Sequence, residues 1–311
     1  GDTITYEIDG NKLTATADGR TVFTLELQSD GQYIFTLLDQ VDGEQGEDGV
    51  TIDFGAIIKV NDYDFDKVSL DNKFCIDIKD DVPELSGKKE QVKVEEDDLT
   101  IPPHLSDGNN EDGSINNHLV TGSIADLIIG GDAPISFEFE GVDPNTVLPA
   151  HTSKGEPISY GVVGDTLTGT ADGRTIFTLK LQSDGSYTFT LNDQIDHEDI
   201  EGENLLTIDF GIMIKAVDVD GDSINLNDKF CVDIEDDIPK LKDGQQISKV
   251  EEDDLTIPPH LSDGNNEDGS NDNHTVEGSL ANFVLVGADE PATFSFVDDF
   301  ADSLPDLKSK G

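Results

Sequence analysis

Apolar and polar residues alternate along much of this chain. Thr21–Leu27 (T-V-F-T-L-E-L) alternates with period two, and Tyr33–Leu37 alternates again after the turn sequence Ser29–Gly31. The same arrangement returns at Thr175–Leu181 and Tyr187–Leu191. Period-two alternation places apolar side chains on one face of a β-strand, and a short Ser-Asp-Gly turn between two such runs is typical of a hairpin. The pattern therefore predicts strands and hairpins in both places.

The chain also repeats itself over a long period. Lys93–Ser114 recurs without a change at Lys249–Ser270, and 249 − 93 = 156 positions separate the two copies. A period of this length is too long for a solenoid unit of roughly 20–45 residues and fits a whole domain. Many short strands and Gly- or Asp-containing turns in each unit predict an all-β fold of tandem β-sandwiches. Only Ser123–Ile129 has the pattern of a helical turn.

Two proline-containing sequences mark the expected unit ends. Asp80–Pro83 reads D-D-V-P and Asp236–Pro239 reads D-D-I-P, and each closes a strand pattern before a polar, Lys-containing stretch. Proline has no N–H to donate to a sheet, so it is expected to stop the strand. We predict the C-terminal part of a unit at residues 1–84, a complete unit at 85–240 and the N-terminal part of the next unit at 241–311. Each end piece either folds as a small domain or is completed by a neighbouring chain.

The charge of the chain restricts its partners. There are 19 basic and 68 acidic residues, which gives a net charge of −49. A chain with this charge repels phosphate, so we expect no nucleic-acid partner and no direct membrane insertion. The sequence shows no apolar run of bilayer length and no N-terminal signal peptide. Compaction of such a chain requires counter-ions or bound metal.

The two cysteines occupy equivalent positions in the repeat. Cys75 lies in K-F-C-I-D-I and Cys231 in K-F-C-V-D-I. A disulfide between equivalent points of successive domains is improbable, because the two Cα atoms must come within about 7 Å. We expect small buried strand residues, with a reactive thiol as the alternative.

Several spaced motifs together resemble a known family. Gly164–His197, Leu206–Gly211, Asp218–Asp222 and Asp236–Pro239, in this order, are similar to the tandem repeat of giant type I-secreted bacterial proteins, the RTX adhesins and RTX structural toxins. The resemblance implies immunoglobulin-like or cadherin-like β-sandwich extender domains with calcium-stiffened junctions. It also implies export from a Gram-negative bacterium to the cell surface or medium. The Gly-Gly-x-Gly-x-Asp nonapeptide array of that class does not occur in this sequence.

One acidic loop has the spacing of a calcium-binding turn. Asp218, Asp220 and Asp222 alternate in D-V-D-G-D, where Gly221 permits a sharp bend. Ca²⁺ takes six to eight oxygen ligands, and carboxylates two residues apart on a loop reach one ion. The counterpart D-Y-D-F-D in the first unit keeps three acids, at Asp62, Asp64 and Asp66, and lacks the glycine. The alternative for both loops is a solvated turn between strands.

The unit junctions supply a second group of candidate calcium ligands. Each D-D-[IV]-P sequence ends one unit, and the V-E-E-D-D sequence opens the next, so we expect their carboxylates to converge around Ca²⁺. The loop from Ser106 to Gly113 is either a further oxygen cage or a solvated turn. Zinc is not expected, because no Cys/His cluster has ligand spacing, and all six histidines are expected in surface loops. The candidate junction ligands are Asp80, Asp81, Glu95, Asp97, Asp98, Asp236, Asp237, Glu251, Asp253 and Asp254.

These patterns favour a structural protein over an enzyme. No nucleophile and base are marked by the sequence, and the acids recur in repeated turn contexts. We therefore expect no enzymatic activity, and extender repeats that contact neighbouring repeats and carry distal domains toward host-cell or surface ligands. The alternative is a carbohydrate- or protein-binding module, although the chain has no Trp.

Overall fold

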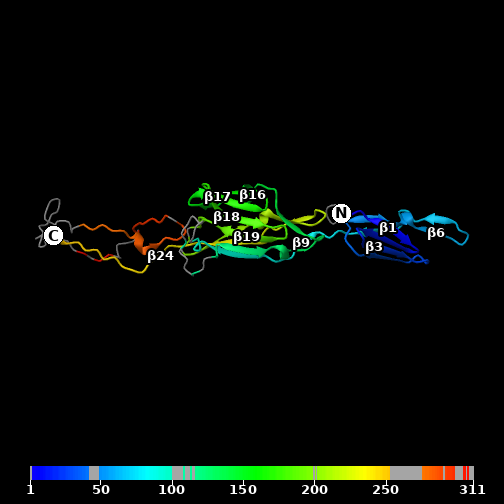
Figure 1. Cartoon of the computed structure of the whole chain (residues 1–311), viewed down its shortest axis with the longest axis horizontal. Coiled ribbons are helices and arrows are strands. Elements are labelled where there is room, and N and C mark those ends of the chain that lie inside the picture. The colour runs from blue at the N-terminus through cyan, green and yellow to red at the C-terminus, as the bar shows by residue number, and fades with distance from the viewer. Residues whose placement is uncertain are drawn as a thin grey trace.

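The fold is described by a computed structural model, and its strands gather in three parts along one long axis (Figure 1). We call residues 2–79 the first unit, residues 83–235 the middle unit and residues 240–297 the third unit. Helical structure in the described part is short, and the α-helix α1 spans only Pro144–Val147. The structure describes residues 2–41, 49–99, 108, 113, 116–198, 200, 202–252, 275–289, 291–297, 304–305 and 307.

The middle unit is built from two layers of β-sheet. One layer is a five-stranded sheet in the order β11-β19-β18-β17-β16, and the other contains β10-β23-β20 and β13-β21-β22. The strand β10 runs parallel to β23, so both strands lead toward the same end of the unit. The bounds are β10 Glu90–Glu95, β11 Leu119–Ser123, β13 Ser136–Phe139, β16 Ser159–Val163, β17 Thr166–Ala171, β18 Arg174–Leu181, β19 Ser186–Leu191, β20 Leu205–Asp209, β21 Ile214–Val217, β22 Ser223–Asn225 and β23 Phe230–Glu235.

Alternating side chains fill the space between these layers. Every second residue of β17 and β19 is buried, as period-two strands require. Phe177 and Phe189 of the five-stranded sheet meet Phe210 beyond β20, with ring centroids 5.5 Å and 5.6 Å apart. All three rings are fully buried. The predicted all-β, sandwich-type fold is therefore confirmed.

The first unit repeats part of this arrangement. Its four-stranded sheet has the order β1-β2-β3-β4, accompanied by the pairs β5-β8 and β6-β7. Phe23 is fully buried against Phe35 and Phe54. The strands predicted at Thr21–Leu27 and Tyr33–Leu37 are confirmed, as are their copies in β18 and β19. The bounds are β1 Thr5–Asp9, β2 Lys12–Ala17, β3 Arg20–Leu27, β4 Tyr33–Leu37, β5 Val50–Asp53, β6 Lys59–Asn61, β7 Lys67–Ser69 and β8 Cys75–Ile78.

Two short linkers, residues 80–82 and 236–239, join the units. The strand that follows each linker ties it to the next unit. The strand β9 (Pro83–Leu85) pairs with β12 (Ile128–Gly130), which belongs to the middle unit. In the same way, β24 (Lys240–Leu241) pairs with β25 (Val284–Leu285) in the third unit. Pro83 therefore begins the short strand that docks on the middle unit, and Pro239 directly precedes the short strand that docks on the third unit.

Three smaller predictions have clear outcomes. The helical turn expected within Ser123–Ile129 is confirmed as a 3-10 helix at Ala125–Leu127. Cys231 is buried in β23 as predicted, whereas Cys75 is exposed, which contradicts the prediction for that copy. The difference arises because β23 lies between β10 and β20, while β8 has β5 as its one neighbour among the described strands. No helix in the described residues is long and apolar enough to cross a membrane.

Candidate metal sites

Five aspartates meet where the first linker docks on the middle unit, and we call them the Asp cluster. Asp80 comes from the linker, Asp132 from the loop between β12 and β13, and Asp218, Asp220 and Asp222 from the loop between β21 and β22. One carboxylate oxygen from each of Asp80, Asp132 and Asp220 lies within 4.8 Å of the others. The same holds for Asp218, Asp220 and Asp222, so Asp220 connects the two groups.

The loop between β21 and β22 is folded by its own backbone amides. The Gly221 and Asp222 N–H groups donate to Asp218 Oδ1 at 3.1 Å and 2.8 Å. Gly221 adopts a φ of 104°, a conformation that favours glycine. The Val219 N–H donates to the Asp132 carbonyl oxygen at 3.3 Å, which holds the two loops together. These bonds use Oδ1 of Asp218 and leave its Oδ2 without a hydrogen bond.

The Asp cluster contains buried carboxylate oxygens without hydrogen-bond partners. These are Oδ2 of Asp80, Oδ2 of Asp218 and both oxygens of Asp220. Burial and the carboxylate of Asp220 raise the pKa of Asp80 and that of Asp218. An uncompensated buried carboxylate is costly unless it is paired or binds a metal ion. Several carboxylate oxygens from a linker and two loops fit a hard divalent cation such as Ca²⁺.

The equivalent loop of the first unit is far more open. Asp62, Asp64 and Asp66 also form a group within 4.8 Å, but all three are exposed. The Asp66 N–H donates to Asp62 Oδ1 at 2.8 Å, so the turn resembles its copy. Phe65 stands where the second copy has Gly221, and it adopts a φ of 71°, which is unfavourable for a bulky residue. This loop carries three carboxylates without the linker or second loop that completes the Asp cluster.

A second group lies at the opposite end of the middle unit, and we call it the His cluster. Glu96 follows β10, His197 lies after β19, and Asp236 begins the second linker. One ligand atom from each lies within 4.8 Å of the others. Asp289 of the third unit lies beside Asp236, and the charges of Glu96 and Asp236 act on its carboxyl group. The His cluster therefore brings together the middle unit, the linker and the third unit.

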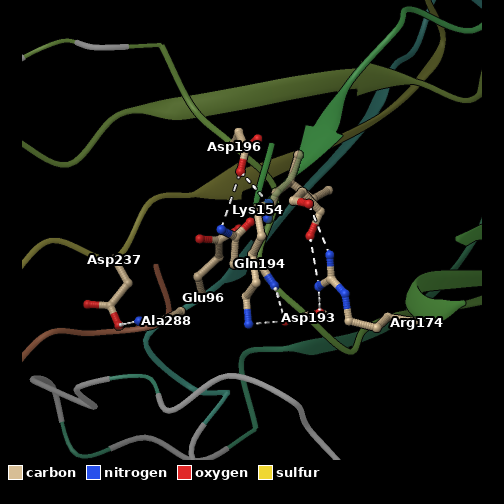
Figure 2. Close-up of polar contacts among 10 residues, drawn as sticks. Glu96, Lys154, Arg174, Asp193, Gln194, Asp196, Asp237 and Ala288 are labelled. Atoms are coloured by element: carbon tan, nitrogen blue, oxygen red, sulfur yellow. Dashed lines mark hydrogen bonds and ion pairs between the residues drawn. The ribbon is translucent and has the colours of Figure 1, made fainter. Parts of the chain in front are cut away.

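Backbone contacts hold Glu96 and the linker in place. The Ile195 N–H donates to Glu96 Oε1 at 2.7 Å, and the Glu96 N–H donates to the Glu235 carbonyl oxygen at 3.1 Å. Figure 2 shows Glu96 beside the segment that contains Gln194 and Asp196. The next linker residue, Asp237, accepts a bond from the Ala288 N–H at 2.8 Å, also drawn in Figure 2. The glycine at position 287 is needed here, because a Cβ would lie 2.8 Å from the Asp237 carboxylate.

Glu96 and His197 of the His cluster, and Asp289 beside it, have strongly shifted pKa values. Burial raises the pKa of Glu96 to about 7, against the opposing effect of His197. Although burial opposes it, the Glu96 carboxylate raises the pKa of His197 to about 9. Burial, followed by the charges of Glu96 and Asp236, raises the pKa of Asp289 to about 8. The cluster therefore retains protons near neutral pH.

The acids that open the middle unit are not near the preceding linker, which corrects the sequence prediction. Asp80 was expected to converge with Glu95, Asp97 and Asp98. The six-residue strand β10 carries these acids about 20 Å along the unit at about 3.3 Å per residue. Because β10 is parallel to β23, Glu95 lies beside Glu235 at the exit to the second linker.

Glu95, Asp97 and Asp98 form their own group within 4.8 Å. Glu95 pairs with Lys93 at 2.6 Å and accepts a bond from Asn117 Nδ2 at 2.6 Å. Asp98 Oδ2 accepts a bond from the Asn117 N–H at 2.6 Å, while its buried Oδ1 has no partner. This group is more compensated than the other two, because a lysine and an asparagine already bind it.

The other predicted ligands have different surroundings. Asp81 is exposed on the first linker, and Asp237 is buried against the third unit. Glu251 pairs with Lys249. Asp253 and Asp254 lie outside the described residues, as does most of the loop from Ser106 to Gly113.

Sequence reasoning missed four residues of these clusters. Glu96 lies inside an acidic run from which only its neighbours were chosen. His197 was expected in a surface loop, but its side chain is 3 % exposed, so this prediction was wrong. Its signal in the sequence was the change from Gly43 in the first copy to histidine in the second. Asp132 and Asp289 occupy corresponding places in two repeats. Each comes near a linker only because β9 pairs with β12 and β24 pairs with β25, which the sequence did not indicate.

The comparisons with known proteins returned no relative. No protein-family model, curated protein or solved structure matches this chain.

Proposed function

We propose that this chain consists of calcium-stabilised extender repeats from a secreted or surface-attached bacterial protein of the RTX adhesin or structural toxin type. The observation that carries the proposal is the Asp cluster, in which a linker residue, Asp80, joins Asp132 and Asp220 of the next unit. Its buried carboxylate oxygens without partners fit a hard cation. The units would act as spacers that hold other domains of the parent protein away from the cell.

The mechanical role follows from the charges at the joint. Asp80, Asp132, Asp218, Asp220 and Asp222 would hold Ca²⁺, which supplies the positive charge that these carboxylates require. Without the ion, like charges at the joint repel, and burial together with the Asp220 carboxylate raises the pKa of Asp80 and that of Asp218. Binding to the folded joint alone stabilises it by mass action. The linker is already aligned by β9, so an ion at its start fixes the angle between units.

The proposed setting and partners agree with this role. Extracellular fluid contains millimolar calcium, and the net charge of −49 disfavours nucleic acid. Each unit contacts its neighbours through the linkers, and ligands on host cells or surfaces would be bound by other domains. The proposal assigns no enzymatic reaction to these repeats.

A ligand-binding module is the alternative, and it would require a binding groove such as the one found in the first unit. The groove in the first unit has a volume of about 390 Å³ and is lined by apolar residues that include Leu13, Leu25 and Ile57. The equivalent residues of the middle unit, Leu167, Leu179 and Met213, are buried in its core. The groove is therefore a part of the sandwich interior that the middle unit covers, which supports the extender role.

Calcium titration of the whole chain tests the proposal. After chelation, millimolar Ca²⁺ is expected to raise the melting temperature and to lengthen the particle in small-angle scattering. Asp220→Asn removes the carboxylate shared by both groups of the Asp cluster and is expected to abolish most of this response. Asp64→Asn, at the matching position of the first unit, is the control and is expected to keep it. An unchanged melting temperature and scattering profile with calcium would contradict the proposal.

A further inference from the structure

The His cluster holds three buried side-chain atoms without hydrogen-bond partners. These are Glu96 Oε2, His197 Nε2 and Asp236 Oδ1. Glu96 is fully buried, and the His197 side chain is 3 % exposed. Leaving a buried polar atom unsatisfied costs about 1–3 kcal/mol, and more for a charged group. Three such atoms on residues whose ligand atoms lie within 4.8 Å indicate a common ligand.

The tautomer of His197 is fixed by its neighbour. His197 Nδ1 lies 3.0 Å from Asn204 Oδ1, which can only accept a hydrogen bond. The orientation of the Asn204 amide is set in turn, because its Nδ2 donates to Asp236 Oδ2 at 3.2 Å. In the neutral form of the ring, Nδ1 therefore carries the proton, and Nε2, which lies 3.7 Å from Glu96 Oε1, has a free lone pair. Metal-binding histidines characteristically engage their other ring nitrogen in such a bond.

The spacing inside the cluster suits an ion. His197 Nε2 lies 3.7 Å from Glu96 Oε1, which is too long for a hydrogen bond. Two ligands that each bind one ion at about 2.0–2.2 Å lie roughly 3–4 Å apart. The carboxylate of Asp289 lies against Asp236 and supplies a further oxygen nearby.

We propose that Glu96, His197 and Asp236 form a binding site for a divalent transition-metal ion of the Zn²⁺ class, separate from the Asp cluster. The ligand chemistry separates the two sites. Imidazole nitrogen suits Zn²⁺ and its neighbours in the first transition series, whereas Ca²⁺ takes oxygen ligands. The Asp cluster offers carboxylates only, while the His cluster combines one nitrogen with carboxylate oxygens. This inference goes beyond the extender role and does not depend on calcium binding.

Metal in this site would fasten the second joint. It would connect the end of β10, the segment after β19 and the linker after β23, with Asp289 of the third unit alongside. The first unit has Gly43 at the position of His197. A nitrogen-containing site is therefore a property of this copy of the repeat, so that joints within one chain differ in the metal that they select.

Zinc binding by the chelated full-length chain in excess calcium tests the proposal. Equilibrium dialysis against micromolar Zn²⁺ with millimolar Ca²⁺ is expected to show one zinc equivalent that His197→Gln removes. Asn204→Ala, which removes the partner of His197 Nδ1 and the amide that donates to Asp236, is expected to weaken zinc binding by about 10–100-fold. His118→Gln and Asp220→Asn are the matched controls, and both are expected to retain the zinc equivalent.

A second measurement does not depend on any variant folding. Nitrogen NMR of the His197 ring in the unmodified chain is expected to show a large shift of Nε2, and not of Nδ1, on addition of Zn²⁺. The proposal is overturned if zinc leaves the His197 ring unchanged. It is also overturned if His197→Gln binds zinc as the original chain does, or if millimolar calcium displaces the zinc. Each of these results leaves the calcium response of the Asp cluster available for its own test.

Discussion

The first and middle units have nearly the same hairpin sequence, yet they bury it to very different extents. Tyr33 is 49 % exposed, whereas its copy Tyr187 is 2 % exposed. Leu37 is 46 % exposed, whereas Leu191 is fully buried. Both tyrosines contact an equivalent phenylalanine, with ring centroids 4.5 Å apart and ring planes tilted by 52°. The local structure is thus conserved between copies while the burial is not.

The difference comes from strands that are distant in sequence. In the middle unit β11 covers β19, β10 covers β23 and β13 covers β21. In the described part of the first unit, β4, β8 and β6 have no such neighbours on those edges. The hairpin forms from its own alternation, but a complete core requires the segments that precede it by about 50 to 100 residues in the repeat. Stability within the chain should therefore differ between copies.

The largest expected difference is in the cost of removing a core leucine. Leu191→Ala should lower the free energy of unfolding of the middle unit by about 2–5 kcal/mol, because it leaves a cavity in a filled core. Leu37→Ala should cost less than about 1 kcal/mol in the first unit, as expected for a largely exposed side chain. Hydrogen exchange followed by peptide mass spectrometry reports each unit separately. Equal costs at both positions would show that the first unit acquires a cover in solution.

The next difference concerns a matched pair of arginines. Arg174 binds Asp193 and Ser153, both of which are fully buried, and Figure 2 shows Arg174 beside Asp193. The equivalent Arg20 binds Asp39 at the surface. Arg174→Ala should cost about 3 kcal/mol, at the low end for a broken buried pair, because Lys154 stays 3.5 Å from Asp193. Arg20→Ala should cost at most about 1 kcal/mol. Chemical denaturation monitored by unit-specific hydrogen exchange measures both, and a reversed order would contradict the assignment of the buried pair.

The next smaller difference is the gain in unfolding free energy that calcium gives to each unit. At 100 times its dissociation constant, an ion that binds only the folded state adds about 2.7 kcal/mol. This gain is expected in the middle unit through the Asp cluster and not in the first unit, where Asp62, Asp64 and Asp66 are exposed. Exchange rates with calcium and with chelator provide the measurement. Similar protection of both units would show that the exposed loop is also a calcium site.

The smallest effect is the pH dependence of the metal-free middle unit. The folded state raises the pKa of Glu96 to about 7 and that of His197 to about 9, so it binds protons more tightly than the unfolded chain. The stability that comes from this tighter proton binding is fully present below the unfolded pKa of each group, and it is lost as pH rises through about 7 and 9. Stability in chelator should therefore fall from pH 5 to pH 9. Glu96→Gln should flatten this fall by about 1–2 kcal/mol.

Denaturation at three pH values compares the original chain with Glu96→Gln. The general repulsion among surface acids is common to both proteins, so the difference between their slopes isolates the His cluster. Identical slopes would show that Glu96 and His197 do not titrate as a pair in the folded protein.

The strands, the hairpins and the gathering of acids in the D-V-D-G-D loop could be predicted from local sequence, and the repeat from comparison of its two copies. The local features depend on alternation, turn residues and spacing within about twenty residues, whereas the repeat depends on the match between Lys93–Ser114 and Lys249–Ser270. Which acids lie beside each linker depends on the tertiary structure, which places Asp80 with Asp132 and Asp220. The prediction joined Asp80 to Glu95, yet the parallel alignment of β10 with β23 sends the opening acids to the far joint.

The burial of His197 was likewise decided by tertiary contacts. Nothing near His197 in the sequence identifies Glu96, about a hundred positions earlier, as the carboxylate that faces it. A strand pattern states which residues share a face, but it does not state which distant strand lies beside them. For this reason the composition of each candidate metal site, unlike the presence of acidic loops, follows from how the sheets are assembled.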